Sequence, residues 1–436
     1  MKLWQKGEPI DKLFERFTIG KDRELDLELA YYDVVASKAH VNMLEKIGLL
    51  SIDEKEALIS ELEHIRRSAE EGTFTIDEGV EDCHSQIELI LTQKLGDVGK
   101  KVHTGRSRND QVLVALKLFT RAQLELIAQQ VKQFFELLQR KSEANKGVLM
   151  PGYTHMQVAM PASFGLWFGA YAESLSDDLV TLKASHQIVN KNPLGSGAGF
   201  GSSFPLDRTY TAAELGFESL NYNVVYAQMT RGKMERVVAQ AIGNIAQTLA
   251  RYAMDVCLYA GQNYDFLRLD TAYTTGSSIM PHKHNPDGFE LVRAKCNQLQ
   301  SLPYELNLMT NNLPSGYHRD FQTLKEHFIP SFRSLVDCLE VATAMTEKLE
   351  VNPEVIQDSK YDLLFTVEEV NQLVIAGVPF RDAYRKVGEK LKAETYEASR
   401  EVNHTHVGSI GNLGNDEIDA VFNETWKYFS GFESND

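Results

Sequence analysis

The segment 111–146 constrains the fold most strongly, because it contains neither glycine nor proline. Its apolar residues, among them Val112, Leu116 and Phe119, recur at the spacing of one helix face. At 1.5 Å per residue, the segment predicts a single helix of roughly 50 Å. A helix of that length usually packs along its side against other helices in a bundle, often with copies from other subunits.

Two further segments, 162–189 and 233–261, show the same helical pattern. A fourth, 288–312, is interrupted by Pro303, which should kink the helix or end it. The connections between these segments are rich in polar residues, glycine and proline, and such loops collect at the ends of a bundle. We therefore predict an all-α protein with a long central helical bundle.

The chain is expected to have three consecutive domains. Residues 1–110 are predicted to form short helices, one of which begins at the capping-box sequence Ser51-Ile-Asp-Glu54. Residues 111–350 form the long-helix bundle and the core of an oligomer. Residues 351–436 are richer in charge and predict a small helical domain at the carboxyl end.

The net charge of −16 disfavours non-specific binding to nucleic acid or to anionic lipid. No apolar run approaches the 18 residues of a membrane span, and the first residues lack the apolar centre of a signal peptide. The four cysteines are far apart in the sequence and predict free thiols in a reducing compartment. We expect a cytoplasmic protein with no membrane or nucleic-acid partner.

The sequence His103-Thr-Gly-Arg-Ser-Arg-Asn-Asp110 places two arginines directly before the 111–146 helix. Arginine side chains at the positive end of a helix are suited to binding carboxylates or phosphates. The alternative is an ordinary cap by Ser107, Asn109 or Asp110, with the arginines in surface ion pairs.

Two polar loops carry groups suited to acid–base chemistry. One is Gly152-Tyr-Thr-His155, because a histidine in a polar loop can serve as an acid–base group near neutral pH. The other is the loop 276–286, which combines glycine, serine and proline with Lys283. His282 and His284 are spaced as a metal pair, but this loop supplies no evident third ligand, so we expect no metal.

The glycine-rich stretch Gly195-Ser-Gly-Ala-Gly-Phe-Gly201 is similar to a phosphate-binding loop. Phe200 stands where the dinucleotide pattern requires glycine, and no Gly-Lys-Ser/Thr follows. A turn that uses the conformational freedom of glycine is the better interpretation.

The loop Gly276-Ser-Ser-Ile-Met-Pro-His-Lys-His-Asn285 resembles the fumarase/aspartase superfamily signature G-S-S-x-M-P-x-K-x-N. The 103–110 sequence resembles the version of the first conserved region found in argininosuccinate lyases, and 152–157 and 317–325 resemble two other regions of that family. Lys2-Leu-Trp4 and Thr18–Arg23 match further family landmarks, and the resemblance runs to about residue 350.

The resemblance implies that argininosuccinate is split into arginine and fumarate by β-elimination, as in arginine biosynthesis, without a cofactor. It assigns Ser277 as the base, His155 as the group on the leaving-nitrogen side and Glu290 as the carboxylate that orients His155. Lys283 and Asn285 would stabilise the dianionic carboxylate formed when the proton leaves. The residues expected to bind substrate are Thr18, Arg108, Asn109, Thr154, Asn285, Tyr317, Gln322 and Lys325. The family also implies a homotetramer whose active sites are shared between subunits.

Several residues depart from the family pattern. Thr18 stands in place of serine, His282 and His284 in place of glutamine and lysine, and His318 and Thr323-Leu324 also differ. Three alternatives therefore stay open. The first is another fumarate-releasing lyase for an N-substituted aspartate, such as adenylosuccinate lyase. The second is a catalytically silent, δ-crystallin-like structural relative, against which the intact signature residues argue. The third is a nucleotide-binding scaffold, which the defective glycine pattern disfavours.

Overall fold

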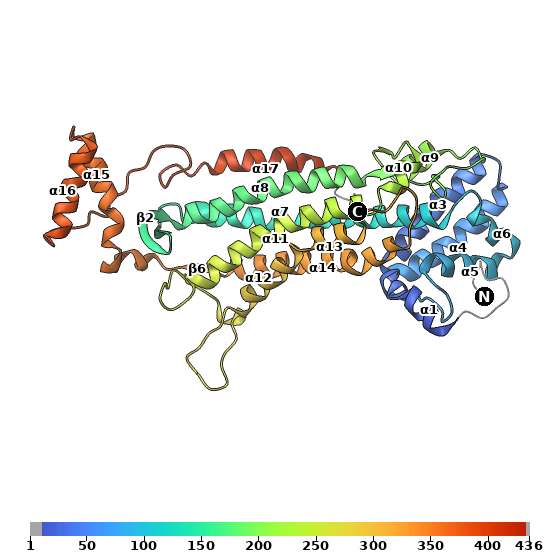
Figure 1. Ribbon diagram of the computed structural model, residues 1–436, viewed down its shortest axis with the longest axis horizontal. Helices are drawn as coiled ribbons and strands as arrows, with labels where there is room; N and C mark the ends of the chain where they lie inside the picture. Colours follow the sequence, from blue (N-terminus) through green and yellow to red (C-terminus); the bar gives the residue numbers. More distant parts are fainter. Residues whose placement is uncertain (1–10, 433–436) are drawn as a thin grey trace. The chain divides into compact units, whose positions relative to one another are not determined.

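The structure is a computed structural model that describes residues 11–432. It is mostly helical (Figure 1). The helices are α1 (Lys12–Ile19), α2 (Asp22–Leu25), α3 (Leu27–Lys46), α4 (Ile52–Glu70), α5 (Cys83–Leu95), α6 (Asp97–Lys100), α7 (Arg108–Ala144), α8 (Phe164–Val189), α9 (Arg208–Glu214), α10 (Val224–Met229), α11 (Lys233–Tyr259), α12 (Asp287–Leu299), α13 (Leu302–Met309), α14 (Asp320–Glu347), α15 (Thr366–Ile375), α16 (Phe380–Lys392) and α17 (Asn415–Ser430). The landmark Lys2-Leu-Trp4 lies outside the described residues.

Short strands and 3-10 helices complete the fold. The strands are β1 (Leu149–Thr154), β2 (Gln157–Ser163), β3 (Lys191–Asn192), β4 (Ser219–Leu220), β5 (Leu267–Arg268) and β6 (Glu350–Val351), and the 3-10 helices are η1 (Lys101–His103), η2 (Thr271–Tyr273), η3 (Pro353–Gln357) and η4 (Ser359–Phe365). β1 pairs with β2 and β5 with β6 in antiparallel fashion, whereas β3 and β4 are parallel.

The predicted long helices are confirmed as α7, α8 and α11, with ends within a few residues of the expected ones. Pro303 lies in the first turn of α13 and separates it from α12, as expected of a residue that cannot continue a helix. The Ser51 capping box at the start of α4 is also present, with both of its reciprocal hydrogen bonds.

The region around His155 differs from the polar loop expected there, because β1 and β2 form a hairpin with His155 and Met156 as its turn. Both residues have positive φ, 52° and 60°, as a tight two-residue hairpin turn requires. Pro151 and Pro161 face each other in the register. A two-stranded hairpin tolerates them, because each strand has a free edge that needs no ladder hydrogen bond.

The chain divides into two compact units. The first contains the residues up to Ile127, Thr181–Gly243 and Leu299–Ser334; the second contains Ala128–Val180, Asn244–Gln298 and the residues from Leu335 on. The first unit has a core that includes Val114, Leu118 and Phe217. In the second, Tyr252 stacks on Trp167 with a centroid separation of 5.5 Å. The three consecutive domains expected from the sequence stay a prediction.

None of the helices in the described part of the chain is long and apolar enough to cross a membrane.

One lysine, Lys117 of α7, is fully buried in the first unit. Its Nζ donates to the Val189 carbonyl at 3.4 Å. Burial lowers the pKa of Lys117 to about 7, although Glu235 acts in the opposite direction. Because the pKa of an unfolded lysine is about 10.4, the unfolded chain binds one more proton than the folded chain between pH 7 and 10. The free energy of unfolding is therefore unaffected by Lys117 above pH 10. It decreases as the pH falls from 10 to 7, because protonation of Lys117 favours the unfolded chain.

We expect Lys117→Met to raise the urea midpoint at pH 7, and the difference from the wild type to shrink toward pH 10. Methionine fills a similar volume and carries no charge to bury. The exposed Lys94→Met is the matched control and should leave the pH dependence unchanged. This account would be contradicted if the urea midpoint of Lys117→Met changed with pH as steeply as that of the wild type.

Candidate functional site

A cavity of about 450 Å³ opens in the first unit. Basic and acidic side chains from separate stretches of sequence line it together with a few apolar ones. The lining residues are Asp22, Asp26, Gly79, Val80, Glu81, Asp82, His84, Ser85, Glu88, Leu89, Thr92, Lys100, Arg108, Asn109, Val112, Arg231, Tyr317, Arg319, Gln322 and Lys325. Arg108, Asn109, Tyr317, Gln322 and Lys325, all predicted from the sequence to bind substrate, are thus brought together.

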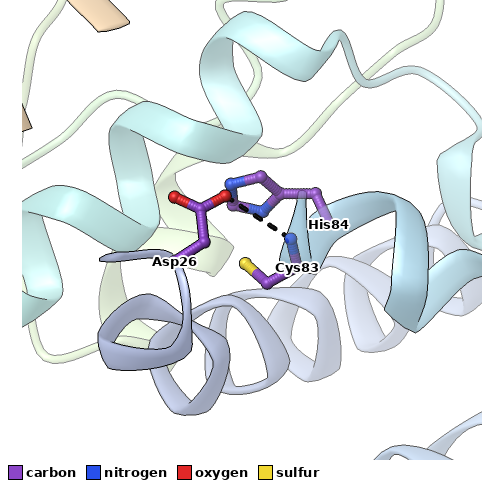
Figure 2. A group of neighbouring side chains, drawn as sticks. All are labelled: Asp26, Cys83 and His84. Carbon is purple, nitrogen blue, oxygen red and sulfur yellow. Dashed lines mark hydrogen bonds between the residues drawn. The ribbon is translucent and has the colours of Figure 1, made fainter. Parts of the chain in front are cut away.

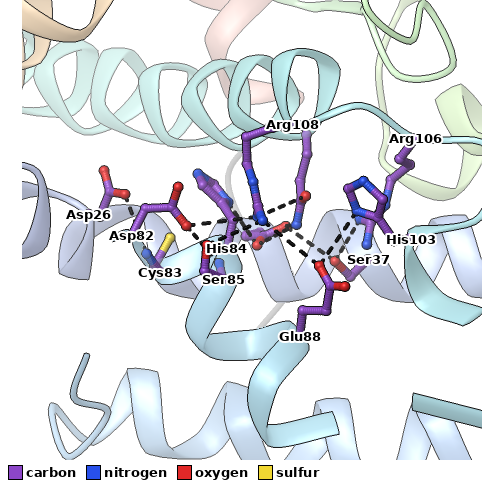
Figure 3. Close-up of polar contacts among 12 residues, drawn as sticks. Asp26, Ser37, Asp82, Cys83, His84, Ser85, Glu88, His103, Arg106 and Arg108 are labelled. Atoms are coloured by element: carbon purple, nitrogen blue, oxygen red, sulfur yellow. Dashed lines mark hydrogen bonds and ion pairs between the residues drawn. The ribbon is translucent and has the colours of Figure 1, made fainter. Parts of the chain in front are cut away.

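Arg108 and Asn109 occupy the first turn of α7 at one wall of this cavity. The guanidinium of Arg108 lies 3.8 Å from both Asp82 and Glu88 (Figure 3). It also donates to Ser85 Oγ at 3.3 Å. These contacts are long, so they hold the guanidinium in place while leaving it able to bind a ligand carboxylate through two hydrogen bonds.

Lys325 of α14 is almost completely buried in the cavity wall. Its ammonium contacts Asp26 at 2.7 Å and Asp22 at 2.8 Å. Burial opposes the charged form, but the two carboxylates outweigh it and raise the pKa of Lys325 above its ordinary value. Burial is also the main cause that raises the pKa of Asp22 to about 6. Lys325 therefore remains a fixed positive charge over the neutral pH range.

The start of α14 is tied to the end of α1 by hydrogen bonds to the carbonyl of Thr18. Gln322 Nε2 donates to this oxygen at 2.7 Å and Arg319 donates at 3.0 Å. Arg319 also pairs with Glu81 at 2.5 Å. The Thr18 hydroxyl donates to Phe14 O of its own helix at 2.9 Å. Thr18 is thus near the cavity through its backbone, and its expected substrate contact stays a prediction.

His84, in the first turn of α5, is a fully buried group of the cavity wall. Its Nδ1 lies 2.9 Å from a carboxylate oxygen of Asp33, which also accepts from Gln111 Nε2. Burial disfavours the charged imidazole, but Asp33 outweighs burial and raises the pKa of His84. The imidazole of His84 lies beside Arg108 in the cavity wall (Figure 3).

The glycine-rich loop 195–201 is a turn, as predicted, and every glycine in it has positive φ. The carboxylate of Asp110 accepts from Gly195 N at 3.0 Å and Gly197 N at 2.9 Å. Its other oxygen accepts from Ser107 N at 2.9 Å. Asp110 therefore acts as a helix cap, which is one of the two interpretations of the 103–110 sequence. Arg108 lines the cavity, which fits the other interpretation, an arginine that binds carboxylates.

We expect Asp110→Asn to destabilise the protein by about 1–3 kcal/mol, because an amide replaces one acceptor oxygen with a donor that faces backbone N–H groups. Urea unfolding of the variant and the wild type gives this difference. Asp97→Asn, which alters an exposed carboxylate of α6, is the matched control and should change little. Equal midpoints for Asp110→Asn and the wild type would show that the hydrogen bonds from Gly195 N, Gly197 N and Ser107 N do not stabilise the protein.

The predicted catalytic residues belong to the second unit. Ser277, Lys283 and Asn285 lie on one loop between η2 and α12, closed by paired backbone hydrogen bonds between Thr275 and Asn285. Ser277 Oγ accepts from Met280 N at 3.1 Å, which fixes the hydroxyl in a local turn.

His155 and Thr154 are exposed at the tip of the β1–β2 hairpin. The unusual backbone of His155 is the kind of strain that concentrates at functional sites. Glu290, in the first turn of α12, forms a 4.0 Å ion pair with Arg293. Its role in orienting His155 stays a prediction, as do the roles of the other site residues.

Sequence reasoning gave no role to nine charged or titratable residues of the cavity, namely Asp22, Asp26, Glu81, Asp82, His84, Glu88, Lys100, Arg231 and Arg319. Asp22 and Asp26 are one helical turn apart in the sequence, a spacing that could have indicated a shared partner. Arg319 lies within the 317–325 segment that resembles the family, although no role was assigned to it, whereas His84 and Arg231 carry no local signal. Arg231 is buried against Glu235 at 3.0 Å and donates to Phe321 O.

The sequence matches known lyases over almost its whole length. A family model described as "Lyase" matches residues 5–301. An argininosuccinate lyase of Bacteroides fragilis is 58% identical over 429 residues, covering 98% of this chain and 96% of the relative. The chain belongs to the argininosuccinate lyase family. The enzyme of that name from Thermotoga neapolitana is 40% identical, covering 90% of this chain and 99% of its own.

The family resemblance predicted from the motifs is therefore confirmed, and the likeness also continues beyond residue 350. Solved structures agree on the fold. An EDDS lyase variant with bound fumarate matches with a TM-score of 0.77 at 21% identity, covering 98% of this chain and 91% of that one. A class II fumarase of Schistosoma mansoni matches with a TM-score of 0.74 at 16% identity, covering 95% of this chain and 93% of the fumarase chain. The fold of the argininosuccinate lyase family is thus shared with other lyases.

Proposed function

We propose that the protein splits argininosuccinate into arginine and fumarate by β-elimination. The observation that carries this proposal is the 58% identity, over 98% of the chain, to a relative named argininosuccinate lyase. The cavity supports it, because the guanidinium of Arg108 lines the cavity with only long ion pairs of 3.8 Å to Asp82 and Glu88. The other cations Lys325, Arg231 and Arg319 each have a close carboxylate partner. Arg108 can therefore bind one carboxylate of a small ligand through two hydrogen bonds.

In the proposed complex, Arg108, Asn109 and Thr154 bind the carboxylates of the succinyl part, with Thr18 as a further contact. Tyr317, Gln322 and Lys325 bind the carboxylate of the arginine part. Two-point binding by Arg108 orients the substrate, and Lys325 provides a charge that burial and its aspartate partners hold in place.

In the proposed reaction, Ser277 takes a proton from the carbon next to one carboxylate of the succinyl part. The electron pair left behind forms the double bond of fumarate as the neighbouring C–N bond breaks, and His155 supplies a proton on the leaving-nitrogen side, directly or through a water. Lys283 and Asn285 stabilise the dianionic carboxylate that precedes bond cleavage. No step requires a cofactor, because guanidinium is a stable leaving group and fumarate is conjugated.

We propose that the active sites are composite and that the protein works as a homotetramer. The cavity is lined by the first unit alone, whereas Ser277 and His155 belong to the second. The long helices of the second unit carry exposed apolar side chains that another copy of the chain could cover. These side chains are Val180 of α8, Met254 of α11, Leu291 of α12 and Val341 of α14. None of the four cysteines, all within the described residues, forms a disulfide, which favours a reducing compartment, so we propose the cytoplasm.

The test is to follow fumarate absorbance with argininosuccinate, adenylosuccinate and aspartate supplied in parallel. We expect the highest kcat/KM with argininosuccinate, and no loss of activity after treatment with a chelator. A higher kcat/KM with either of the other substrates would assign the protein to another lyase activity. Absence of fumarate with all three would favour the silent structural relative.

A further inference from the structure

Three side chains with metal-binding atoms converge at the wall of the cavity (Figure 2). They are Asp26, which directly precedes α3, and Cys83 and His84, which begin α5. All three residues are buried, and one ligand atom from each lies within 4.8 Å of the other two. Within the described chain, no other group of three or more histidine, cysteine, aspartate or glutamate residues meets this distance.

The imidazole of His84 is arranged as in metal sites. Its Nδ1 is held by Asp33 at 2.9 Å, and its Nε2 is buried without a hydrogen-bond partner. A histidine that binds a metal through one nitrogen usually pairs the other with a carboxylate, which fixes the ring and its tautomer. A buried ring nitrogen without a partner is costly unless a ligand satisfies it.

Asp26 has one oxygen available on the side of Cys83 and His84. Its Oδ1 accepts from Lys325 Nζ at 2.7 Å, whereas Oδ2 accepts one long hydrogen bond, of 3.4 Å, from Cys83 N and keeps a second lone pair. The carboxylate therefore lies between the Lys325 ammonium and the cysteine–histidine pair. It can pair with the ammonium or bind an ion held by Cys83 and His84.

We propose that Asp26, Cys83 and His84 bind one thiophilic divalent cation of the Zn²⁺ class. Thiolate, imidazole and carboxylate are the ligands that zinc takes in proteins, in tetrahedral geometry. Bonds of about 2.0–2.3 Å place such ligand atoms about 3.3–3.5 Å apart, so a small side-chain rotation closes the site. The fourth position faces the cavity, because Asp26 and His84 both line it. A bound ion would thus occupy part of the space proposed for substrate.

Lys325 competes with the ion for Asp26. In the wild type the ammonium repels a cation, so binding should be weaker than at a dedicated structural zinc site. Lys325→Met removes the competitor and leaves Asp22 and Asp26 without their cation. We therefore expect this variant to bind the metal at least about 10-fold more tightly than the wild type.

The direct test uses Co²⁺ as the probe with the full-length protein. We expect one Co²⁺ per chain and a thiolate-to-cobalt charge-transfer band in the near ultraviolet. Cys83→Ser and Cys83→Ala should both lose the band. Cys257→Ser, which alters another free and less buried cysteine, is the matched control and should keep it. Circular dichroism confirms that each variant is folded.

A wild type without the band, or a band that persists in both Cys83 variants, would overturn the proposal. So would equal affinities for Lys325→Met and the wild type. These spectra do not depend on the proposed function. A second readout does rest on it: Co²⁺ should slow fumarate release by the wild type but not by Cys83→Ser. Inhibition that is equal in both proteins would place the inhibiting ion elsewhere.

Discussion

Ser277→Ala is expected to lower kcat by about 10³-fold or more while leaving KM within a few-fold of the wild type. The reason is that a base acts only in the transition state, whereas the proposed binding groups of the cavity remain intact. Ser277 lies in a locally closed loop, and its hydroxyl accepts only local hydrogen bonds from Ile279 N and Met280 N. The change should therefore leave folding nearly unaffected. Steady-state kinetics with argininosuccinate measure the effect.

The neighbouring Ser278→Ala is the matched control, because it removes a hydroxyl from the same loop without touching the proposed base. It should retain most of the activity. If Ser277→Ala kept a near-normal kcat, another group would have to take the proton. A large loss in both variants would indicate that the loop, rather than one hydroxyl, had been damaged.

Mixing two inactive variants is expected to restore activity. His155→Asn and Ser277→Ala should each be nearly inactive alone. If a site takes His155 and Ser277 from different chains, some sites in a mixed oligomer receive both intact residues. We expect recovery of a substantial fraction of the wild-type rate, on the order of a quarter per site when two chains are chosen at random in equal proportion. Joint unfolding and refolding, followed by the fumarate assay, measures it.

The control mixes each variant with itself under the same conditions, which should restore nothing. Mass spectrometry of differently tagged chains establishes that mixed oligomers have formed. A mixture that contains mixed oligomers and stays as inactive as its parents would exclude sites that take the two residues from different chains. Activity of either variant alone would instead revise the role of that residue.

Local sequence was sufficient for much of the fold. Helices α7, α8 and α11 were predictable because helical periodicity and the absence of glycine and proline act over consecutive residues. The capping box at Ser51 and the helix boundary at Pro303 follow from the hydrogen-bonding groups of single residues. The β1–β2 hairpin was missed because its turn is His155-Met156, which lacks the asparagine and glycine typical of such turns.

The sequence by itself also determined the family, because the motifs at 103–110, 152–157 and 276–285 are short, ordered and specific. The environment of the cavity was decided only by the tertiary structure. Lys325 and Asp26 are 299 positions apart, and His84 and Asp33 are 51 apart. No local pattern links such pairs, because a buried charge selects its partner through desolvation and packing, which exist only once the helices have come together. The same holds for Cys83 and His84, neighbours in the sequence that folding places beside Asp26.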